Sequence, residues 1–412
     1  MKDDQRLHVT TRKAGSYFNN VQSRASRLVR DAVFARGREN LRAWLPSLRN
    51  PVTDSDAVSA SDRVRREALG GALWVADRAA IRGDELSISG WIIRLPEDRG
   101  DIQPCLNGRP FERFASGEPR PDLSSVFPFV PGADRAGFSA GISLRPEERD
   151  GEVALDIEIV RRDTSAPLRK WQTLSVLPDS RERWPMPDGM RIARVHGAAA
   201  PEAFRMVGYS NVRKIERVLR EFQGCGWEGF PRILDWGCGC GRLSRYLLET
   251  PAVELTGADI DRDTISWCRQ HLSSATFVDL PLHPPSSLKD AEFDLIVGVS
   301  IFTHLTETVQ LEWLGELQRL SARGALLLMS IHGPTIHAMS GDGAFCESVQ
   351  QKGIVDGRSY DLDAVLEDKE YYRTTHHSHA YVRQVWGRLF EIVEILPACI
   401  GNMQDLVVMR RR

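Results

Sequence analysis

The chain has 412 residues, of which 42% are hydrophobic and 27% are charged, and its formal net charge is -2. This length allows two domains and an extension, and the near-neutral charge gives no general reason to expect nucleic acid as a partner. The seven cysteines form no Cys-x-x-Cys pair, so we predict reduced thiols and no metal site.

Residues 1–68 are predicted to form a basic, partly helical extension. Through Asn50 the chain has eleven Lys or Arg residues and four Asp or Glu residues, and apolar side chains recur at helical spacing from Val21 to Leu48. Such a helix can lie on an anionic membrane or dock on its own protein or a subunit partner; we favour docking. Without a signal peptide or spanning segment, we expect a cytoplasmic protein, with peripheral contact to the inner membrane face as the alternative.

The pattern changes to a period of two in residues 69–182. Residues 86–92, 138–144 and 153–159 alternate, with Val153 placed on the inward face. Several such strands between Pro, Gly and Asp clusters predict an all-β sandwich or small barrel. Gly90-Trp91, Arg120-Pro-Asp122 and Ala136-Gly-Phe138 resemble positions in accessory β-sandwich modules beside bacterial glycosyltransferases. The module's aromatic residues fit a core better than a sugar-stacking platform.

A glycine-rich stretch follows a predicted strand and precedes a helix in residues 232–247. Its pattern is Asp235-x-Gly-x-Gly-x-Gly241, which differs from the Gly-x-Gly-x-x-Gly of dinucleotide sites. It resembles the first motif of the class I S-adenosylmethionine-dependent methyltransferases. That resemblance implies that Asp235 holds the amino group of the ligand and that the turn makes room for its methionine part. The predicted turn residues are Gly237, Cys238, Gly239 and Gly241.

Strands and helices alternate after this stretch, as in a doubly wound sheet. Strands are predicted near 253–258, 275–278, 293–300 and 324–331, and a closing antiparallel hairpin at 390–396 and 404–409. The expected fold for residues 183–412 is a Rossmann-like, seven-stranded methyltransferase domain. Asp259 at the end of the second strand suits the ribose hydroxyls, with Ile260 beside it and Asp261 as the alternative acid or an N-cap. The resemblance implies that Asp279 and Leu280 lie near the adenine, and Ser300 lies at the ligand edge.

Two histidines follow strands on the same predicted edge. His304 comes after the fourth strand and His332 after the fifth. If the acceptor is a hydroxyl group, it must lose its proton, and an imidazole is the natural general base. Either histidine is a candidate, with an N-cap or a loop hydrogen bond as the alternative role.

Residues 333–378 have no clear core period and are predicted to form a substrate lid. Within this insertion, Tyr372, Arg373, His376 and His377 are predicted to contact the substrate. A metal site or a general base are the alternatives for these histidines and for His379, whose spacing does not match a zinc site.

The glycine stretch, Ile331-His-Gly333, Tyr371 to Ser378 and Gln404 to Val408 together resemble bacterial methyltransferases of surface-polysaccharide assembly. This resemblance implies O-methylation of a sugar or glycan, including a lipid-linked one, with S-adenosylmethionine as the cofactor. A small-metabolite methyltransferase and a non-catalytic scaffold are the alternatives. A homo-oligomer or a complex with a glycosyltransferase is compatible with the resemblance. Nucleic acid is disfavoured, because no Asn-Pro-Pro-Tyr or Asp-Pro-Pro-Tyr stretch occurs and the basic segment is confined to one end.

Overall fold

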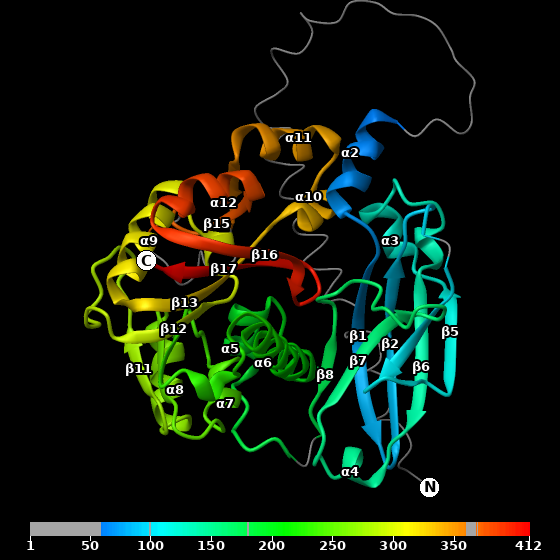
Figure 1. Ribbon diagram of the computed structural model, residues 1–412, viewed down its shortest axis with the longest axis horizontal. Coiled ribbons are helices and arrows are strands. Elements are labelled where there is room, and N and C mark those ends of the chain that lie inside the picture. The colour runs from blue at the N-terminus through cyan, green and yellow to red at the C-terminus, as the bar shows by residue number, and fades with distance from the viewer. Residues whose placement is uncertain (1–58, 99, 179–180, 360–367, 369) are drawn as a thin grey trace, which may run out of the picture.

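The computed structural model describes residues 59–98, 100–178, 181–359, 368 and 370–412. Figure 1 shows two parts side by side, an antiparallel β part and a larger part in which helices flank a sheet. In the described part of the chain, no helix combines the length and hydropathy needed to cross a membrane. The basic stripe predicted from Val21 to Leu48 lies outside the described residues.

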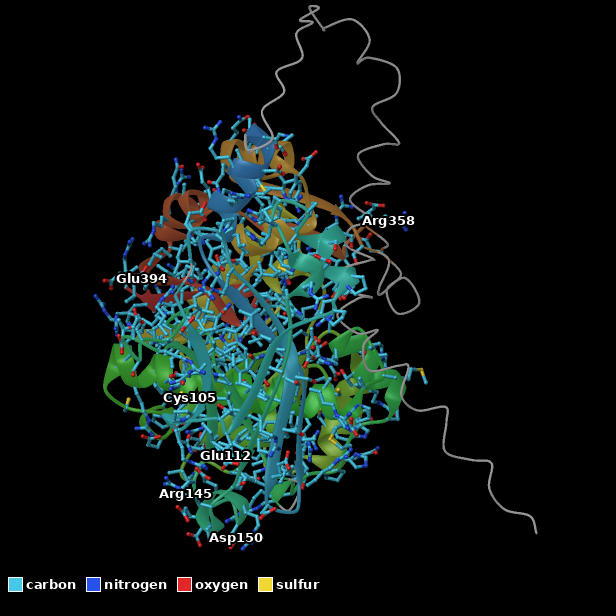
Figure 2. All side chains as sticks on the ribbon, turned by 90° about the vertical axis from the view of Figure 1, so that its right-hand side faces the viewer. Cys105, Glu112, Arg145, Asp150, Arg358 and Glu394 are labelled. Atoms are coloured by element: carbon cyan, nitrogen blue, oxygen red, sulfur yellow. The ribbon has the colours of Figure 1, made fainter. Side chains whose placement is uncertain are left out.

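The smaller part consists of two antiparallel sheets. One has the order β1 (Leu73–Arg82), β2 (Glu85–Ile93), β6 (Gly137–Ser143), β5 (Arg113–Glu118), and the other β4 (Arg109–Pro110), β3 (Ile102–Leu106), β7 (Leu155–Arg161), β8 (Leu174–Val176). Alternating side chains of both sheets share one core, which confirms the predicted sandwich. Figure 2 views this side, with α4 (Pro146–Arg149), flanked by Arg145 and Asp150, at one end.

Two details of the sandwich differ from, or settle, the sequence interpretation. Val153 was placed on the inward face, but it lies before β7 begins and is 44% exposed. The aromatic residues Trp91, Phe127 and Phe129 are buried in a core that also contains Ala338 of the larger part. The core interpretation is therefore correct for these three side chains, which leave no face open to a sugar.

The larger part contains a seven-stranded sheet with the order β11-β10-β9-β12-β13-β17-β16. The strands are β9 (Arg232–Trp236), β10 (Glu254–Asp259), β11 (Thr276–Asp279), β12 (Phe293–Gly298), β13 (Ser321–Ile331), β16 (Phe390–Ile400) and β17 (Gln404–Arg411). β9 to β13 are parallel, and β17 runs antiparallel to both β13 and β16. The predicted Rossmann-like sheet and its closing hairpin are confirmed. Because β9 and β12 are central and neighbours, their carboxyl ends define the ligand edge.

Helices cover both faces of this sheet. Those before the insertion are α5 (Gly189–His196), α6 (Pro201–Gln223), α7 (Ser244–Leu247), α8 (Arg262–His271) and α9 (Glu307–Leu320). One core lies between the sheet and α9, and another lies between the sheet and α6. In α9, Leu314, Leu317 and Leu320 are buried, but Leu311, which continues their three-residue spacing, is 42% exposed, and Trp313 is buried in its place. The reason is that positions three residues apart drift by about 60° per step around a helix of 3.6 residues per turn.

The insertion, residues 333–378, is more ordered than the predicted lid. It contains α10 (Pro334–Ser340), α11 (Gly343–Lys352) and the hairpin β14 (Ile354–Arg358) and β15 (Arg373–His377); α12 (His379–Val385) follows it. Residues 360–367 and 369 lie outside the description. The sequence hid these elements because they are short and because part of what they bury is polar, including His337 and Thr375.

Helix α2 (Ala60–Leu69) crosses the predicted boundary at residue 68 and packs on α10 and α11 (Figure 1). The buried guanidinium group of Arg65 donates to the carbonyl oxygen of Ala338 at 2.7 Å and to that of Val126 at 2.9 Å. Ser61 Oγ accepts from the backbone N–H of Gly343 at 2.9 Å. This helix therefore joins the sandwich to the insertion.

A second buried junction holds the sandwich on the larger part. Asn402, at the tip of the β16–β17 hairpin, donates through Nδ2 to the carbonyl oxygen of Trp74 at 3.1 Å and accepts from Lys214 Nζ at 2.5 Å. Gln172 Nε2 donates to the Asn402 carbonyl oxygen at 3.1 Å. Burial lowers the pKa of Lys214 to about 8. The side-chain amides of Asn402 and Gln172 and the Lys214 ammonium group thus form one buried hydrogen-bond network, which favours a specific orientation of the two parts.

Candidate cofactor and acceptor site

A cavity of about 1100 Å³, counted to its open mouth, lies at the carboxyl ends of β9, β10 and β12. Ten of the predicted site residues line it: Asp235, Gly237, Cys238, Gly239, Asp259, Ile260, Leu280, Ser300, His304 and Tyr372. Arg194, Arg242, Trp313 and Tyr371 are among the other residues of its wall. The open sheet edge and the cavity therefore coincide, as the fold requires.

The glycine turn, residues 235–241, forms one wall of the cavity. Its backbone is tied to the neighbouring strand, since the N–H groups of Gly237 and Cys238 both donate to the carbonyl oxygen of Ala258, at 2.7 and 3.1 Å. Gly239 has φ +54°, and a Cβ there would lie 2.5 Å from Cγ2 of Val195. Only glycine fits such a position without strain, which keeps the backbone open to a ligand. Gly241 shares the turn but is not part of the cavity wall.

Asp235 lies beneath the turn with its carboxylate almost fully buried. It accepts a hydrogen bond from Ser244 Oγ at 2.6 Å. Burial raises the pKa of Asp235 to about 6, while the bond from Ser244 and the nearby charge of Arg242 act in the opposite direction. A buried carboxylate of this kind is suited to a cationic ligand group, which would replace the water it has lost.

Asp259 at the end of β10 accepts backbone hydrogen bonds at both oxygens, from Gly239 N and from Asp261 N, each at 2.8 Å. A carboxylate has about four lone-pair sites, so both oxygens keep capacity for hydroxyl donors. Burial raises the pKa of Asp259 to about 6. Asp261 also lines the cavity, but its side chain accepts from the N–H groups of Asp263 and Thr264 and caps α8. Of the two alternatives for Asp261, a second ribose-binding acid or an N-cap, the structure shows the N-cap.

The adenine end differs from the prediction for one residue. Leu280 lines the cavity, whereas Asp279 does not and instead pairs with Arg269 at 3.1 Å. On the other side, Ser300 has φ +64° at the end of β12. Its N–H donates to Ser330 Oγ at 2.7 Å, and both serine hydroxyls donate to Gln404 Oε1, at 3.0 and 2.8 Å. Gln404 thus supports a strained backbone at the ligand edge, a role with no sequence signal.

His304 follows β12 and lines the cavity. Its Nδ1 lies 2.9 Å from the carbonyl oxygen of Arg373, and its ring stacks on Tyr372 with 4.2 Å between centroids. A carbonyl oxygen only accepts, so Nδ1 carries the proton and Nε2 is the basic nitrogen of the neutral ring. The insertion therefore fixes both the orientation and the tautomer of this histidine.

His332 was the other candidate base, but it stands behind His304, with 6.3 Å between ring centroids, and is not part of the cavity wall. Burial lowers the pKa of His332 well below its ordinary value. His332 is in turn followed by His376, at 5.2 Å between centroids. The structure thus brings one of the two predicted bases to the cavity.

His376 and His377 were predicted to contact substrate, but the structure buries both away from the cavity. His376 packs against Phe345 and His337, at 5.0 and 5.4 Å between ring centroids, and neither of its ring nitrogens has a hydrogen-bond partner among the described residues. His377 Nε2 lies 2.9 Å from Gln310 Oε1. Arg373 is held by Asp356 at 2.6 Å and by Glu370, so its backbone carbonyl, not its guanidinium group, faces the site. Among the residues that the structure describes, no group of three or more metal-binding side chains could hold a metal ion.

Comparison with known proteins identifies the larger part. A family model described as a methyltransferase domain matches residues 233–324. A malonyl-acyl-carrier-protein O-methyltransferase of Magnetococcus marinus is 30% identical over 118 residues, which are 28% of this chain and 41% of that protein. The chain therefore matches less than half the length of this curated relative.

Solved structures give the same kind of likeness. The chain is similar to an S-adenosylmethionine-dependent methyltransferase of Mesorhizobium loti, with 17% identity over 44% of this chain and 91% of that one, at a TM-score of 0.34. It is also similar to the 1,6-didemethyltoxoflavin N1-methyltransferase of Burkholderia thailandensis, with 15% identity over 59% and 96%, at a TM-score of 0.36.

The C-terminal half of the chain is a class I S-adenosylmethionine-dependent methyltransferase domain. S-adenosylmethionine is the cofactor that this family implies, and the residues present fit it. The glycine turn leaves a space that a Cβ would fill, and the buried carboxylate of Asp235 and the half-buried carboxylate of Asp259 line the same cavity from β9 and β10. Asp235 would hold the amino group, and Asp259 would accept the ribose hydroxyls.

Proposed function

We propose that the protein is an S-adenosylmethionine-dependent O-methyltransferase that acts on a hydroxyl group of a sugar or glycan in bacterial surface-polysaccharide assembly. The observation that carries the O-methylation is His304, whose Nδ1 is anchored on the Arg373 carbonyl oxygen at the cavity wall. An amine can attack in its neutral form, whereas a hydroxyl group needs a base in the transition state. His304 supplies one in the correct tautomer.

The chain's own residues have three tasks in this reaction. The glycine turn and the two carboxylates bind and orient the cofactor, which supplies the methyl group. The wall formed by Ile301, Leu305 and Trp313 keeps water from the reacting atoms. His304 Nε2 takes the proton of the acceptor hydroxyl as the methyl group is transferred. The resulting imidazolium then releases this proton to solvent.

The choice of a sugar acceptor is supported by the resemblance to polysaccharide-associated methyltransferases and by the half-buried ring of Tyr372 in the wall. Flat aromatic faces suit the C–H face of a pyranose ring. The relative from Magnetococcus marinus is itself named an O-methyltransferase, on a different acceptor.

The test is transfer of labelled methyl from S-adenosylmethionine to three acceptor sets: lipid-linked glycan extracts, soluble sugar nucleotides and a small-metabolite mixture. We expect alkali-stable methyl ethers on the glycan fraction, and their loss in His304→Asn. Label only in small metabolites would reject the glycan. If the protein binds the cofactor but none of the three acceptor sets leads to S-adenosylhomocysteine, a non-catalytic scaffold is favoured. Base-labile label would indicate a carboxyl acceptor instead.

A further inference from the structure

The short turn that carries His304 has a buried support of its own. This 3₁₀ helix, η4 (Phe302–His304), is too short to satisfy all of its backbone groups. The side-chain amide of Gln310, in α9, donates through Nε2 to the carbonyl oxygen of Phe302 at 2.9 Å and to that of Leu305 at 3.0 Å. The two carbonyl groups stand on either side of His304 in the chain, and the Gln310 side chain is fully buried.

Strand β15 of the insertion contacts both the turn and the glutamine that supports it. Thr375 Oγ1 donates to the carbonyl oxygen of Leu305 at 2.8 Å, and His377 Nε2 lies 2.9 Å from Gln310 Oε1. Side chains two residues apart project from the same face of a strand. One face of β15 therefore holds the turn directly through its threonine and indirectly through its histidine.

The network leaves one arrangement of its protons. Carbonyl oxygens only accept, so the amino end of the Gln310 amide faces the turn and its oxygen faces His377, whose Nε2 must then carry the proton. Burial lowers the pKa of His377 to about 3, so its ring is neutral. The Leu305 carbonyl oxygen uses both of its lone pairs, one for Gln310 and one for Thr375. This buried network holds the backbone on both sides of His304 against β15.

We propose that Gln310 is a positioning residue for methyl transfer, which aligns His304 by fixing its turn against the insertion. The inference rests on the proposed function, in which His304 Nε2 takes the acceptor proton. The bond from His304 Nδ1 to the Arg373 carbonyl oxygen keeps its geometry only while the turn and β15 hold their relative position. A displacement of about 1 Å in an active site can cost roughly 100-fold in rate. Gln310 is not part of the cavity wall, so its effect on the reaction passes through His304.

The test compares Gln310→Met with Gln318→Met. Methionine keeps the approximate length of the side chain but cannot donate to either carbonyl group. Gln318 is the matched control, because it lies in the same helix and its Nε2 donates to the carbonyl oxygen of Leu389 at 2.8 Å, outside the cavity wall. NMR of isotope-labelled histidine rings reports the tautomer of His304 without any acceptor, and His304→Asn assigns its signals. We expect the Nδ1–H form in the wild type and in Gln318→Met, and a mixture of tautomers in Gln310→Met.

Turnover supplies the second readout. In Gln310→Met, kcat for labelled methyl transfer should fall roughly 10- to 100-fold, while the Kd for S-adenosylmethionine changes by less than about twofold. Thr375→Val removes a single bond and should lower kcat roughly 3- to 10-fold, whereas Thr375→Ser should retain the wild-type value. This pair replaces Gln310→Met if that variant does not fold by circular dichroism, and it is judged by the same two readouts.

The outcomes separate this role from the proposed function. The positioning role is wrong if a folded Gln310→Met protein keeps the wild-type tautomer of His304, or if Gln318→Met changes that tautomer equally. It is also wrong if Gln310→Met weakens cofactor binding as much as turnover, since that would indicate a general effect on the fold. A changed tautomer with unchanged methyl transfer supports the positioning role and instead overturns the assignment of His304 as the base.

Discussion

The glycine turn and the insertion contribute to the same cavity in contrasting ways. The turn presents backbone and two carboxylates whose hydrogen-bond partners lie within 20 residues along the sequence. The insertion acts on the site from a distance, because Arg373 orients a histidine that lies 69 residues earlier in the chain. The cofactor end of the site is therefore a local construction, and the acceptor end depends on tertiary packing. Substitutions at the two ends should separate binding from turnover.

The largest effect is expected at His304. His304→Asn keeps an amide that can donate to the Arg373 carbonyl oxygen but lacks the basic Nε2, so kcat should fall roughly 10²- to 10⁴-fold. The Kd for S-adenosylmethionine should change by less than about twofold, because binding belongs to the other end. Steady-state kinetics and calorimetry measure the two quantities.

His271 offers the matched control for that variant. Its Nδ1 makes the same kind of bond, 2.9 Å from the carbonyl oxygen of Trp267, but it does not line the cavity. His271→Asn should retain full turnover. Full turnover in His304→Asn as well would show that another group is the base.

Substitution in the turn should have the opposite signature. In Gly239→Val the side chain meets Val195, and the backbone at φ +54° is strained, so cofactor affinity should fall roughly 100-fold or more. Gly315, in α9, has open space around its Cα, and Gly315→Ala is the control that should bind normally. Normal cofactor binding by a folded Gly239→Val protein would show that the cofactor does not bind at the turn.

The pH dependence of binding tests the carboxylates. Asp235 and Asp259 both have pKa values raised to about 6 by burial, and a bound ammonium group favours the ionised form. The free protein therefore takes up protons below pH 6 that the complex must release, so affinity should fall as the pH falls from 7 to 5. It should be at least about tenfold weaker at pH 5 than at pH 7. If calorimetry shows the same affinity at pH 5 and pH 7, the roles given to these acids are contradicted.

The smallest effects are expected from the two buried histidines of the insertion. His377→Phe leaves Gln310 Oε1 without its partner in the core and should cost about 1–3 kcal/mol in the free energy of unfolding. His376→Phe removes two unpartnered ring nitrogens and should be neutral within about 1 kcal/mol or stabilising. Urea denaturation compares them. A loss of turnover in a folded His376→Phe protein would restore its predicted substrate role.

The same contrast explains how far the sequence leads. Continuous apolar strands and the Asp235 to Gly241 pattern carry their structural meaning within a few residues. The strands of the larger part could therefore be predicted, and the resemblance supplied the closing hairpin and most of the predicted cofactor residues, which line the cavity. His376 looked like a loop residue because its burial comes from Phe345 and His337, which are about 30 and 40 residues away. Asp279 fitted a family position, yet its side chain turns to Arg269.

Other parts of the site have no signal in the sequence at all. Gln404 lies 104 residues from the Ser300 hydroxyl that it accepts from, and nothing in the composition of either segment links them. Nothing in the sequence distinguishes the ion pairing of Arg194 from that of Arg242. In the structure Arg194 pairs with Asp261 and Asp263, whereas Arg242 forms no ion pair with a described carboxylate.

Helix α2 has a consequence for how the molecule is made. Arg65 bonds to the carbonyl oxygen of Val126 in the sandwich and to that of Ala338, 273 residues later, so one side of the packing site of this helix is not synthesised until most of the chain has left the ribosome. Leu69 packs mainly on the sandwich, so it can be covered as the sandwich folds, whereas the contacts of the helix with the insertion come later. A shortened protein that begins after residue 69 would lack a piece of the finished core, and a fusion partner is better placed ahead of residue 59.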